Sequence, residues 1–369
     1  MITSVLFITV CFLAYANGAN DNFKGVATLF GSGTANYRLA LSWATLTTLA
    51  GSICAVFLAQ TLMVKFSGKG LAPDALIQSL PFMIAVAGGA GMTVILATRF
   101  GFPISTTHAL LGAMVGSTLL ATVGEMNPAP LLNNFVLPLL LSPLVALLLA
   151  ALLYRLQHKL SVFNQPLCLC VEEPDSLVLA ASSNAAMALS VDLSSALIIA
   201  PQTACTERDL GVVLGFDARR ILDSLHFCSA GAVCFARGLN DTPKMAALLL
   251  LAPGFSLQWI IVVIAMAMLL GGLFNARRVA ETMSHKITPI TPVQGLSANL
   301  TTALLVIFAS KLGMPVSTTH VSVGALFGIG LTGGKANNDI IASIALSWLL
   351  TLPCAALCSA VIYAVSTRF

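Results

Sequence analysis

Two short polar motifs, each present twice, contain the residues of this chain that could do chemistry. The first reads Gly-x-Asn-Asp and ends at Asp21 and at Asp241. The second, Pro-x-Ser-Thr-Thr-His, occupies residues 103–108 and 315–320. The copies follow one another in the same order, at offsets of 220 and 212 residues, within otherwise apolar sequence. This spacing indicates an internally duplicated protein with a duplicated polar site.

The aspartates of the first motif are the strongest candidates for function. An aspartate in an apolar helix is costly, so it needs a partner or a water-filled cavity. Asp21 and Asp241 each follow an asparagine, Asn20 and Asn240. The glycine of each motif is expected to weaken the helix and to free backbone carbonyls. Carboxylate, amide and carbonyl oxygens together make a site for Na⁺, whereas a protonatable aspartate suits H⁺.

A lysine follows each of these aspartates three residues later, Lys24 and Lys244. On a helix this spacing permits an ion pair. One interpretation is that each lysine only clamps its aspartate structurally, and another is that the lysines extend away to the lipid interface. Because the arrangement is duplicated, a functional role for the aspartates is favoured, with the lysines as accessory site residues.

The second motif offers hydrogen-bond donors, whereas the first offers oxygen acceptors. Proline and hydroxyl residues at the start of a helix present hydroxyl donors and unpaired backbone N–H groups at the positive helix end, where an oxyanion fits. Two such ends could surround a tetrahedral anion with six hydroxyls and no arginine. The alternative is that the hydroxyls only cap their own helices. The predicted anion-binding hydroxyl residues are Ser105, Thr106, Thr107, Ser317, Thr318 and Thr319.

The histidines that close this motif, His108 and His320, are assigned a capping or packing role in preference to proton transfer. No nucleophile with a base and an orienting group is visible, and neither is a metal cluster. The sequence therefore predicts no enzyme, no resident cofactor and no metal other than Na⁺ as a coupling ion.

The amino-acid composition indicates the environment in which the chain folds. Of its 369 residues, 57% are hydrophobic and only 9% are charged, with a mean hydropathy of +0.93. Soluble proteins have about 25% charged residues. The chain is therefore expected to be an integral membrane protein in contact with the lipid bilayer, with no nucleic-acid partner.

Ten apolar segments are long enough to cross a bilayer, which takes about 20 residues each. Five lie in each half, and an odd number per repeat makes the second copy enter the membrane from the opposite side. The predicted fold is an all-α polytopic membrane protein of about ten spans, in two inverted five-span repeats with discontinuous or re-entrant helices. The predicted segments are 2–22, 38–62, 79–98, 105–123, 134–154, 222–242, 255–274, 293–310, 317–333 and 340–364.

Lysine and arginine counts predict the orientation. With the N-terminus outside, eleven of them fall in inner loops and four in outer loops, or six and four without the central segment. This asymmetry favours both termini outside and the central segment in the cytoplasm. The predicted domains are a first membrane repeat, 1–154, a central cytoplasmic loop, 155–221, and a second, inverted repeat, 222–369. The central loop is a linker, or alternatively a small regulatory subdomain.

The duplicated motifs, with the stretch Arg277-Arg278-Val-Ala-Glu281-Thr before the second Pro-x-Ser-Thr-Thr-His copy, resemble the inorganic phosphate transporter (PiT) family. The resemblance covers both halves, about 300 residues, and excludes the central segment. It implies a cation-coupled secondary transporter that moves phosphate, sometimes as a metal–phosphate complex, by alternating access. It also implies that the two aspartates and both hydroxyl triplets bind substrate, and that the Asn-Asp pairs bind the coupling ion.

This chain departs from the family at its lysines, where many members have small residues. A fixed ammonium could replace Na⁺, so the coupling ion, H⁺ or Na⁺, stays open. A sulfate carrier is the alternative within the family, but at neutral pH only phosphate, which is protonated, can donate a hydrogen bond to an aspartate. An anion channel is disfavoured because buried carboxylates repel anions. A bacterial-type inner membrane is the expected location, and a homodimer is left open.

Overall fold

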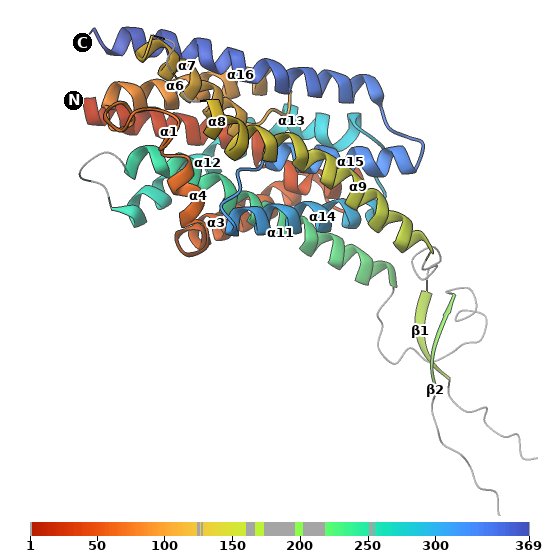
Figure 1. The fold of residues 1–369 in the computed structure, drawn as a ribbon. Coiled ribbons are helices and arrows are strands. Elements are labelled where there is room, and N and C mark those ends of the chain that lie inside the picture. Colours follow the sequence, from red (N-terminus) through yellow and green to blue (C-terminus); the bar gives the residue numbers. More distant parts are fainter. Residues whose placement is uncertain are drawn as a thin grey trace, which may run out of the picture. The chain divides into compact units, whose positions relative to one another are not determined.

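The computed structural model describes residues 2–123, 126, 128–159, 167–172, 196–201, 218–250, 254 and 256–368. These residues form helices, apart from one pair of strands (Figure 1). The chain divides into two compact units, Met1–Arg155 with His226–Phe369, and Leu156–Leu225. The first unit contains both copies of both motifs.

The helices of the first half and those of the second follow one another in a similar order. In the first half they are α1 (Ile2–Asp21), the 3₁₀ helix η1 (Lys24–Val26), α2 (Ala27–Gly31), α3 (Tyr37–Leu58), α4 (Gln60–Lys65), α5 (Asp74–Ile77), α6 (Leu80–Arg99), α7 (Thr106–Ala121), α8 (Pro128–Leu131), the π-helix η2 (Leu132–Val136) and α9 (Leu137–Lys159). In the second half they are α11 (Ala218–Leu250), α12 (Leu257–Asn275), α13 (Arg277–Glu281), the π-helix η4 (Thr282–Lys286), α14 (Pro292–Lys311), α15 (Thr318–Thr332) and α16 (Asn338–Ser366).

The second unit contains the strands β1 (Leu167–Glu172) and β2 (Ala196–Pro201), which pair antiparallel with Leu167 opposite Pro201. Most of the predicted central loop, 155–221, lies outside the described residues. Its cytoplasmic location and its role as a linker or regulatory subdomain stay predictions.

Polar residues in front of apolar runs determine where several helices begin. The Asn36 side chain accepts a hydrogen bond from the Leu39 backbone N–H at the start of α3, at 2.9 Å. Thr291 and Gln294 form a capping box at the start of α14. Such caps satisfy backbone donors that have no partner within the helix. Within the helices the backbone bonds to itself, as a hydrocarbon environment requires.

Each of the ten segments predicted to cross a membrane is largely helical. In the part of the chain that the structure describes, seven helical stretches are long and apolar enough to span a bilayer. The other three are α7 with 16 residues, α15 with 15 residues, and α11, which has 33 residues but carries charged motif residues. The chain is thus an integral membrane protein whose candidate spans are all helical, while the ten-span count and the inversion of the repeats stay predictions.

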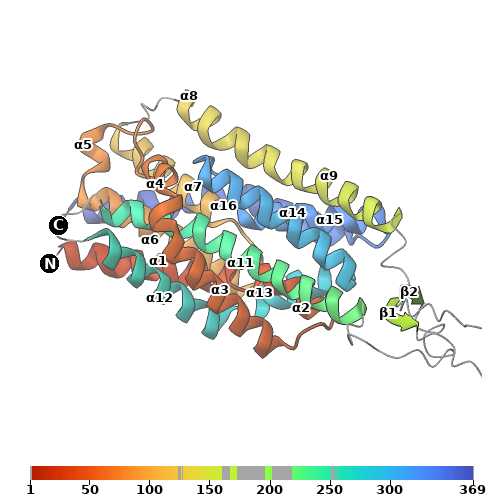
Figure 2. The same ribbon diagram turned by 90° about the horizontal axis from the view of Figure 1, so that it is seen from below.

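The helices of the first unit lie side by side along a common direction, and both termini reach the same end of this unit (Figures 1 and 2). Termini on one side are what an even number of crossings produces. Which side of the membrane that end faces stays a prediction.

Several helices of one half pack on helices of the other half. α1 packs on α12, and α16 packs on α7. The glycine of each Gly-x-Asn-Asp motif permits such close contact: a Cβ atom on Gly18 would lie 1.8 Å from the Met268 carbonyl oxygen, and one on Gly238 would lie 2.2 Å from that of Thr48. The two halves therefore interleave around the motifs.

These contacts correct the role expected for the motif glycines. The Gly18 carbonyl is not free, because it accepts a hydrogen bond from the Asn22 backbone N–H at 3.0 Å. Gly238 lies within the continuous helix α11. The glycines serve close helix packing, and the carbonyl groups that reach the site come from other residues.

The two copies of the first motif differ in backbone. In the first copy the helix ends at Asp21, and η1 begins at Lys24, so the motif lies at a helix break. In the second copy α11 continues past Asp241, with Pro243 inside it. The chain therefore has a helix break at the first copy and a continuous helix at the second, and the re-entrant segments stay a prediction.

Candidate functional site

The four motif copies meet inside the helical unit. The Thr106 hydroxyl of α7 donates to the Asp21 carboxylate at 3.0 Å. Lys24 contacts the Thr319 hydroxyl of the opposite half, and Lys244 contacts that of Thr107 in return. Residues up to 295 positions apart in the sequence therefore form one polar cluster.

Lys24 lies at the centre of the first half-site. Its ammonium group pairs with the Asp21 carboxylate. It also donates to the Ile104 carbonyl oxygen at 2.8 Å and to Thr319 Oγ1 at 2.6 Å. Its side chain is buried, with 5% of the residue exposed.

Lys244 repeats this arrangement in the second half-site. It pairs with Asp241 Oδ1 at 3.1 Å. It also donates to the Val316 carbonyl oxygen at 3.1 Å and to Thr107 Oγ1 at 2.7 Å. Both lysines face the interior of the site, so the interpretation that they extend to the lipid interface is wrong.

The carbonyl groups of the site come from the segments in front of α7 and α15. The Ile104 oxygen, which accepts from Lys24, also accepts a hydrogen bond from the Thr319 hydroxyl at 2.9 Å. The Val316 oxygen, which accepts from Lys244, also accepts one from the Thr107 hydroxyl at 3.3 Å. Each half therefore receives a hydroxyl donor from the other half. These carbonyls were not predicted from sequence, because their residues, isoleucine and valine, have no polar side chain.

The two motif asparagines hold the surrounding segments in place. Asn20 donates to the Thr98 hydroxyl at 2.9 Å and to the Phe102 carbonyl at 3.0 Å, and its side-chain oxygen accepts from Lys24 at 2.7 Å. Asn240 accepts from the Ser310 hydroxyl at 3.2 Å. Both amide oxygens are thus already engaged by protein donors.

The three hydroxyls of each triplet have different partners. Ser105 and Ser317 cap their own helices, accepting hydrogen bonds from the backbone N–H groups of His108 and His320 at 3.2 Å each. The first hydroxyl of each triplet is therefore occupied as the capping alternative expected. Thr107 and Thr319 reach across to the other half, as described above. Thr106 contacts Asp21, and Thr318 is buried with 5% exposed.

The imidazole rings of the two motif histidines pack against each other, with His108 and His320 ring centroids 4.4 Å apart. The His320 ring also stacks on Trp348 of α16 at 3.8 Å. Trp348 in turn donates from its indole nitrogen to the Pro103 carbonyl at 3.0 Å. The two rings thus pack both Pro-x-Ser-Thr-Thr-His copies against α16. The backbone N–H groups of His108 and His320, and not their rings, take part in helix capping.

Arg237 is a site residue that the motifs do not indicate. It is 1% exposed, its Nε lies 3.8 Å from Asp241 Oδ2, and its Nη2 donates to Asn17 Oδ1 at 2.7 Å. Asn17 in turn donates to Asp21 at 2.9 Å and to Asp241 at 3.2 Å. The position that holds Asn17 in the first copy holds an arginine in the second, and the expectation of a site without arginine is wrong. The spacing of four residues before each aspartate was the available signal.

The cluster is therefore charged, buried and asymmetric. Three cations, Lys24, Lys244 and Arg237, face two carboxylates, Asp21 and Asp241, and each of the five residues is at most 5% exposed. Buried charges require pairing and further hydrogen bonds. The pairing leaves one positive charge in excess, which is suited to an anion.

The described residues contain no group of three or more His, Cys, Asp or Glu side chains that could hold a metal ion. The Asn17 amide joins the two aspartates, and each aspartate also pairs with its own lysine. The absence of a resident metal or cofactor stays a prediction.

Comparisons with known proteins bear on this site. The model of the phosphate transporter family matches residues 17–359. A Pyrococcus abyssi protein provisionally named a phosphate permease is 27% identical, over 95% of this chain and 94% of its own. The Arabidopsis thaliana protein named inorganic phosphate transporter 2-1, chloroplastic, is 28% identical, over 93% of this chain and 68% of its own. A solved structure described as the sodium-dependent phosphate transporter has a TM-score of 0.77 and 22% identity, covering 100% of this chain and 99% of that one, and so shares the fold.

Proposed function

This chain belongs to the phosphate transporter family, and on that premise we propose that it is a secondary active transporter of inorganic phosphate. The observation that carries the proposal is the buried cluster of three cations and two carboxylates, to which both halves contribute. A positive excess attracts an oxyanion, and burial in both halves suits a site that opens to either side in turn.

The anion ligands in this proposal are the groups that now bond to one another across the halves. Lys24 and Thr319 are 2.6 Å apart, and Lys244 and Thr107 are 2.7 Å apart. Phosphate oxygens accept from ammonium and hydroxyl groups, and from backbone N–H groups at helix starts such as those of α7 and α15. Binding would exchange hydrogen bonds within the protein for hydrogen bonds to the anion, so the net cost of release stays small.

The carboxylates favour phosphate over sulfate. Protonated phosphate can donate a hydrogen bond to Asp21 or Asp241, whereas sulfate at neutral pH has only acceptors and would place its charge against theirs. Asp241 is held by Lys244 at 3.1 Å, close to the hydroxyls proposed for the anion. A sulfate carrier remains the second candidate within the family.

The same geometry supports H⁺ as the coupling ion. Na⁺ needs several free oxygen ligands. Here an ammonium group lies on each motif carboxylate, where Na⁺ would have to bind, and both motif asparagine oxygens accept from protein donors. The arranged residues do not fit Na⁺ well, whereas a proton on a carboxylate would release its lysine toward phosphate. The sodium dependence named for the solved relative belongs to that protein.

Alternating access around a midplane site completes the proposal. Hydrogen bonds from the lysines cross between the halves, and α1 packs on α12. Opening of the site would have to break the lysine–threonine contacts that cross between the halves. This geometry leaves four further expectations open. They are a bacterial-type inner membrane, both termini outside, transport of phosphate as a metal–phosphate complex, and a homodimer.

The test is uptake of radiolabelled phosphate into proteoliposomes with pH and Na⁺ gradients imposed separately. We expect saturable uptake driven by the pH gradient, with sulfate a weak competitor. Uptake driven only by Na⁺ would overturn the coupling proposal. Current that is proportional to voltage and does not saturate would overturn the transporter and indicate a channel.

A further inference from the structure

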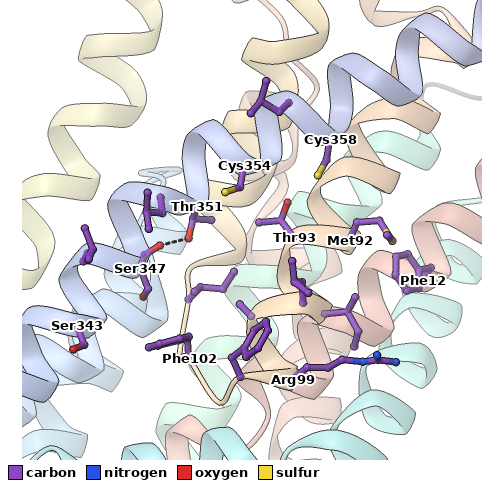
Figure 3. Close-up of a pocket in the computed structure, with 18 residues that line it drawn as sticks. Phe12, Met92, Thr93, Arg99, Phe102, Ser343, Ser347, Thr351, Cys354 and Cys358 are labelled. Carbon is purple, nitrogen blue, oxygen red and sulfur yellow. Dashed lines mark hydrogen bonds between the residues drawn. The ribbon is translucent and has the colours of Figure 1, made fainter.

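A large groove lies outside the polar site, between α6 and α16 (Figure 3). Its volume is about 940 Å³, at the upper end of the range of about 300–1,000 Å³ found for small-molecule sites. Phe12 of α1 and the segment after α6 complete the wall. Arg99 lies in the lower part of the view and Cys358 in the upper part (Figure 3).

The groove wall is apolar in its chemistry even where it contains hydroxyl residues. Thr93 and Thr351 donate to carbonyl oxygens of their own helices, Gly89 at 2.9 Å and Ser347 at 2.6 Å. The hydroxyl of Ser347 is also used within α16. Hydroxyl groups that bond to their own helix in this way have no free proton to donate to a ligand. The groove therefore suits a hydrocarbon chain.

The groove opens to the surroundings of two helices that are apolar and long enough to span a membrane. Leu96 and Met92 of α6 are 58% and 53% exposed, and Leu346 and Leu350 of α16 are 56% and 52% exposed. In a membrane protein, exposed apolar side chains on such helices face lipid. The occupant that the environment supplies is an acyl chain.

The charged edge selects among lipids. Among the described residues, Arg99 is the one charged side chain that lines the groove, and it forms no ion pair with any described acidic residue. Arg278 donates to the Arg99 carbonyl, and Arg277 next to it pairs with Glu281 at 3.3 Å. Three arginines against one glutamate leave this edge positive, so it complements an anionic phospholipid headgroup.

The groove also contacts the back of the polar site. Phe102 and Ile104 line it. Their carbonyl oxygens accept hydrogen bonds from the site residues Asn20, at 3.0 Å, and Lys24, at 2.8 Å. An occupant of the groove would therefore support the segment that supplies carbonyls to the site.

We propose that the α6–α16 groove binds the acyl chain of an anionic phospholipid whose headgroup pairs with Arg99, and that this lipid supports the segment 100–105. Binding of the lipid does not depend on the proposed function. Its effect on transport does, so the two are measured separately.

Binding is measured on the purified chain by native mass spectrometry, with phosphatidylglycerol and phosphatidylcholine of the same acyl chains. We expect the chain to retain phosphatidylglycerol preferentially, and Arg99→Gln to weaken that retention about fivefold, the size of one lost surface charge contact. Arg38→Gln is the matched control, because Arg38 is exposed at the start of α3 and does not line the groove. Equal retention of both lipids, or unchanged retention by Arg99→Gln, would overturn the proposal.

The acyl chain is tested by filling the groove. Cys354→Phe places a ring in it, whereas Val361→Phe adds the same ring to an exposed position of α16 outside it. We expect only Cys354→Phe to lose phosphatidylglycerol. Equal loss in both variants would show that the groove is not the binding place.

The effect on transport is measured in phosphatidylcholine vesicles with and without phosphatidylglycerol. We expect phosphatidylglycerol to stimulate phosphate uptake by the parent and to have less effect on Arg99→Gln. Stimulation that is equal in both would overturn the supporting role of the lipid. Absence of phosphate uptake in every vesicle, with selective lipid retention intact, would count against the proposed function alone.

Discussion

Each motif aspartate forms an ion pair with a buried lysine. Substitution of a single residue of a pair therefore affects stability as well as transport. Asp21 pairs with Lys24, and Asp241 pairs with Lys244 and lies near Arg237. Removing one partner of a buried pair leaves a charge without compensation, at a cost of about 3–5 kcal/mol. Removing both partners avoids that cost. Single and paired substitutions therefore separate stability from transport.

We predict that Asp21→Asn and Asp241→Asn each abolish coupled phosphate uptake and lower thermal stability, because a buried ammonium loses its counter-charge. The double variant Asp21→Asn with Lys24→Gln should regain stability and remain inactive. Uptake in proteoliposomes and thermal unfolding in detergent are the measurements. Near-normal uptake in either single variant would remove the aspartate from the site.

The second residue-scale prediction concerns the coupling ion. Lys24→Ala combined with Lys244→Ala removes the two ammonium groups that lie on the carboxylates, which exposes oxygen ligands to a metal ion. We expect phosphate uptake by this variant to become stimulated by Na⁺, measured with and without a Na⁺ gradient. A variant that responds to Na⁺ as the parent does would rule out replacement of the ion by lysine.

At the scale of elements, the starts of α7 and α15 combine a cap with a binding group. Ser105 and Ser317 cap the helices, whereas Thr107 and Thr319 reach the opposite half. The serine and the last threonine of each triplet thus have different roles. Substitution of the serine should lower stability, whereas substitution of that threonine should weaken phosphate binding.

Thr107→Val and Thr319→Val should each weaken phosphate binding about tenfold or more, since a hydrogen bond to a charged partner contributes about 1.5–3 kcal/mol. Ser105→Ala should instead lower stability by about 1 kcal/mol through loss of a cap. Phosphate titration and thermal unfolding of the same samples distinguish the two effects. If either threonine can be replaced with unchanged affinity, the two-sided anion site is wrong.

Close packing of α1 on α12 is a further property of elements. A Cβ atom on Gly18 would lie 1.8 Å from the Met268 carbonyl oxygen, so backbone must move to admit it. We predict that Gly18→Ala lowers stability by about 1–3 kcal/mol or more, as overpacking does. Gly333→Ala is the control, because the nearest atom to its Cβ would be 3.5 Å away. Equal unfolding temperatures for the two variants would contradict the packing argument.

At the scale of the whole molecule, the interleaved halves and the position of the termini constrain the topology. Both termini lie at the same end of the helical unit (Figure 2). Together with the excess of lysine and arginine in the predicted inner loops, this favours both termini outside.

We predict that phosphatase fused to the C-terminus is active and that fluorescent protein fused there is dark in bacterial cells, because the former folds outside and the latter inside. A tag at the N-terminus should be accessible to a protease added from outside. Reporters that place the two ends on opposite sides would contradict an even number of crossings, and both ends inside would reverse the orientation.

Local patterns in the sequence were sufficient to predict the class of protein, the ten helical segments and the four motif copies that form the site. Burial of apolar segments in lipid depends on composition and length, and each predicted segment is largely helical. Duplication of Asp21 and Asp241, with lysines at matching positions, identified the charged residues because buried charge is rare in such segments.

Tertiary structure alone decided which groups these residues meet. The direction of Lys24 and Lys244, the carbonyls of Ile104 and Val316, and the contact of Arg237 with Asn17 depend on segments that are distant in the sequence. So does the role of Gly18, which admits α12 and does not free a carbonyl. A sequence pattern reports neighbours along one helix, whereas these contacts join elements from separate parts of the chain, so only the packed fold determines them.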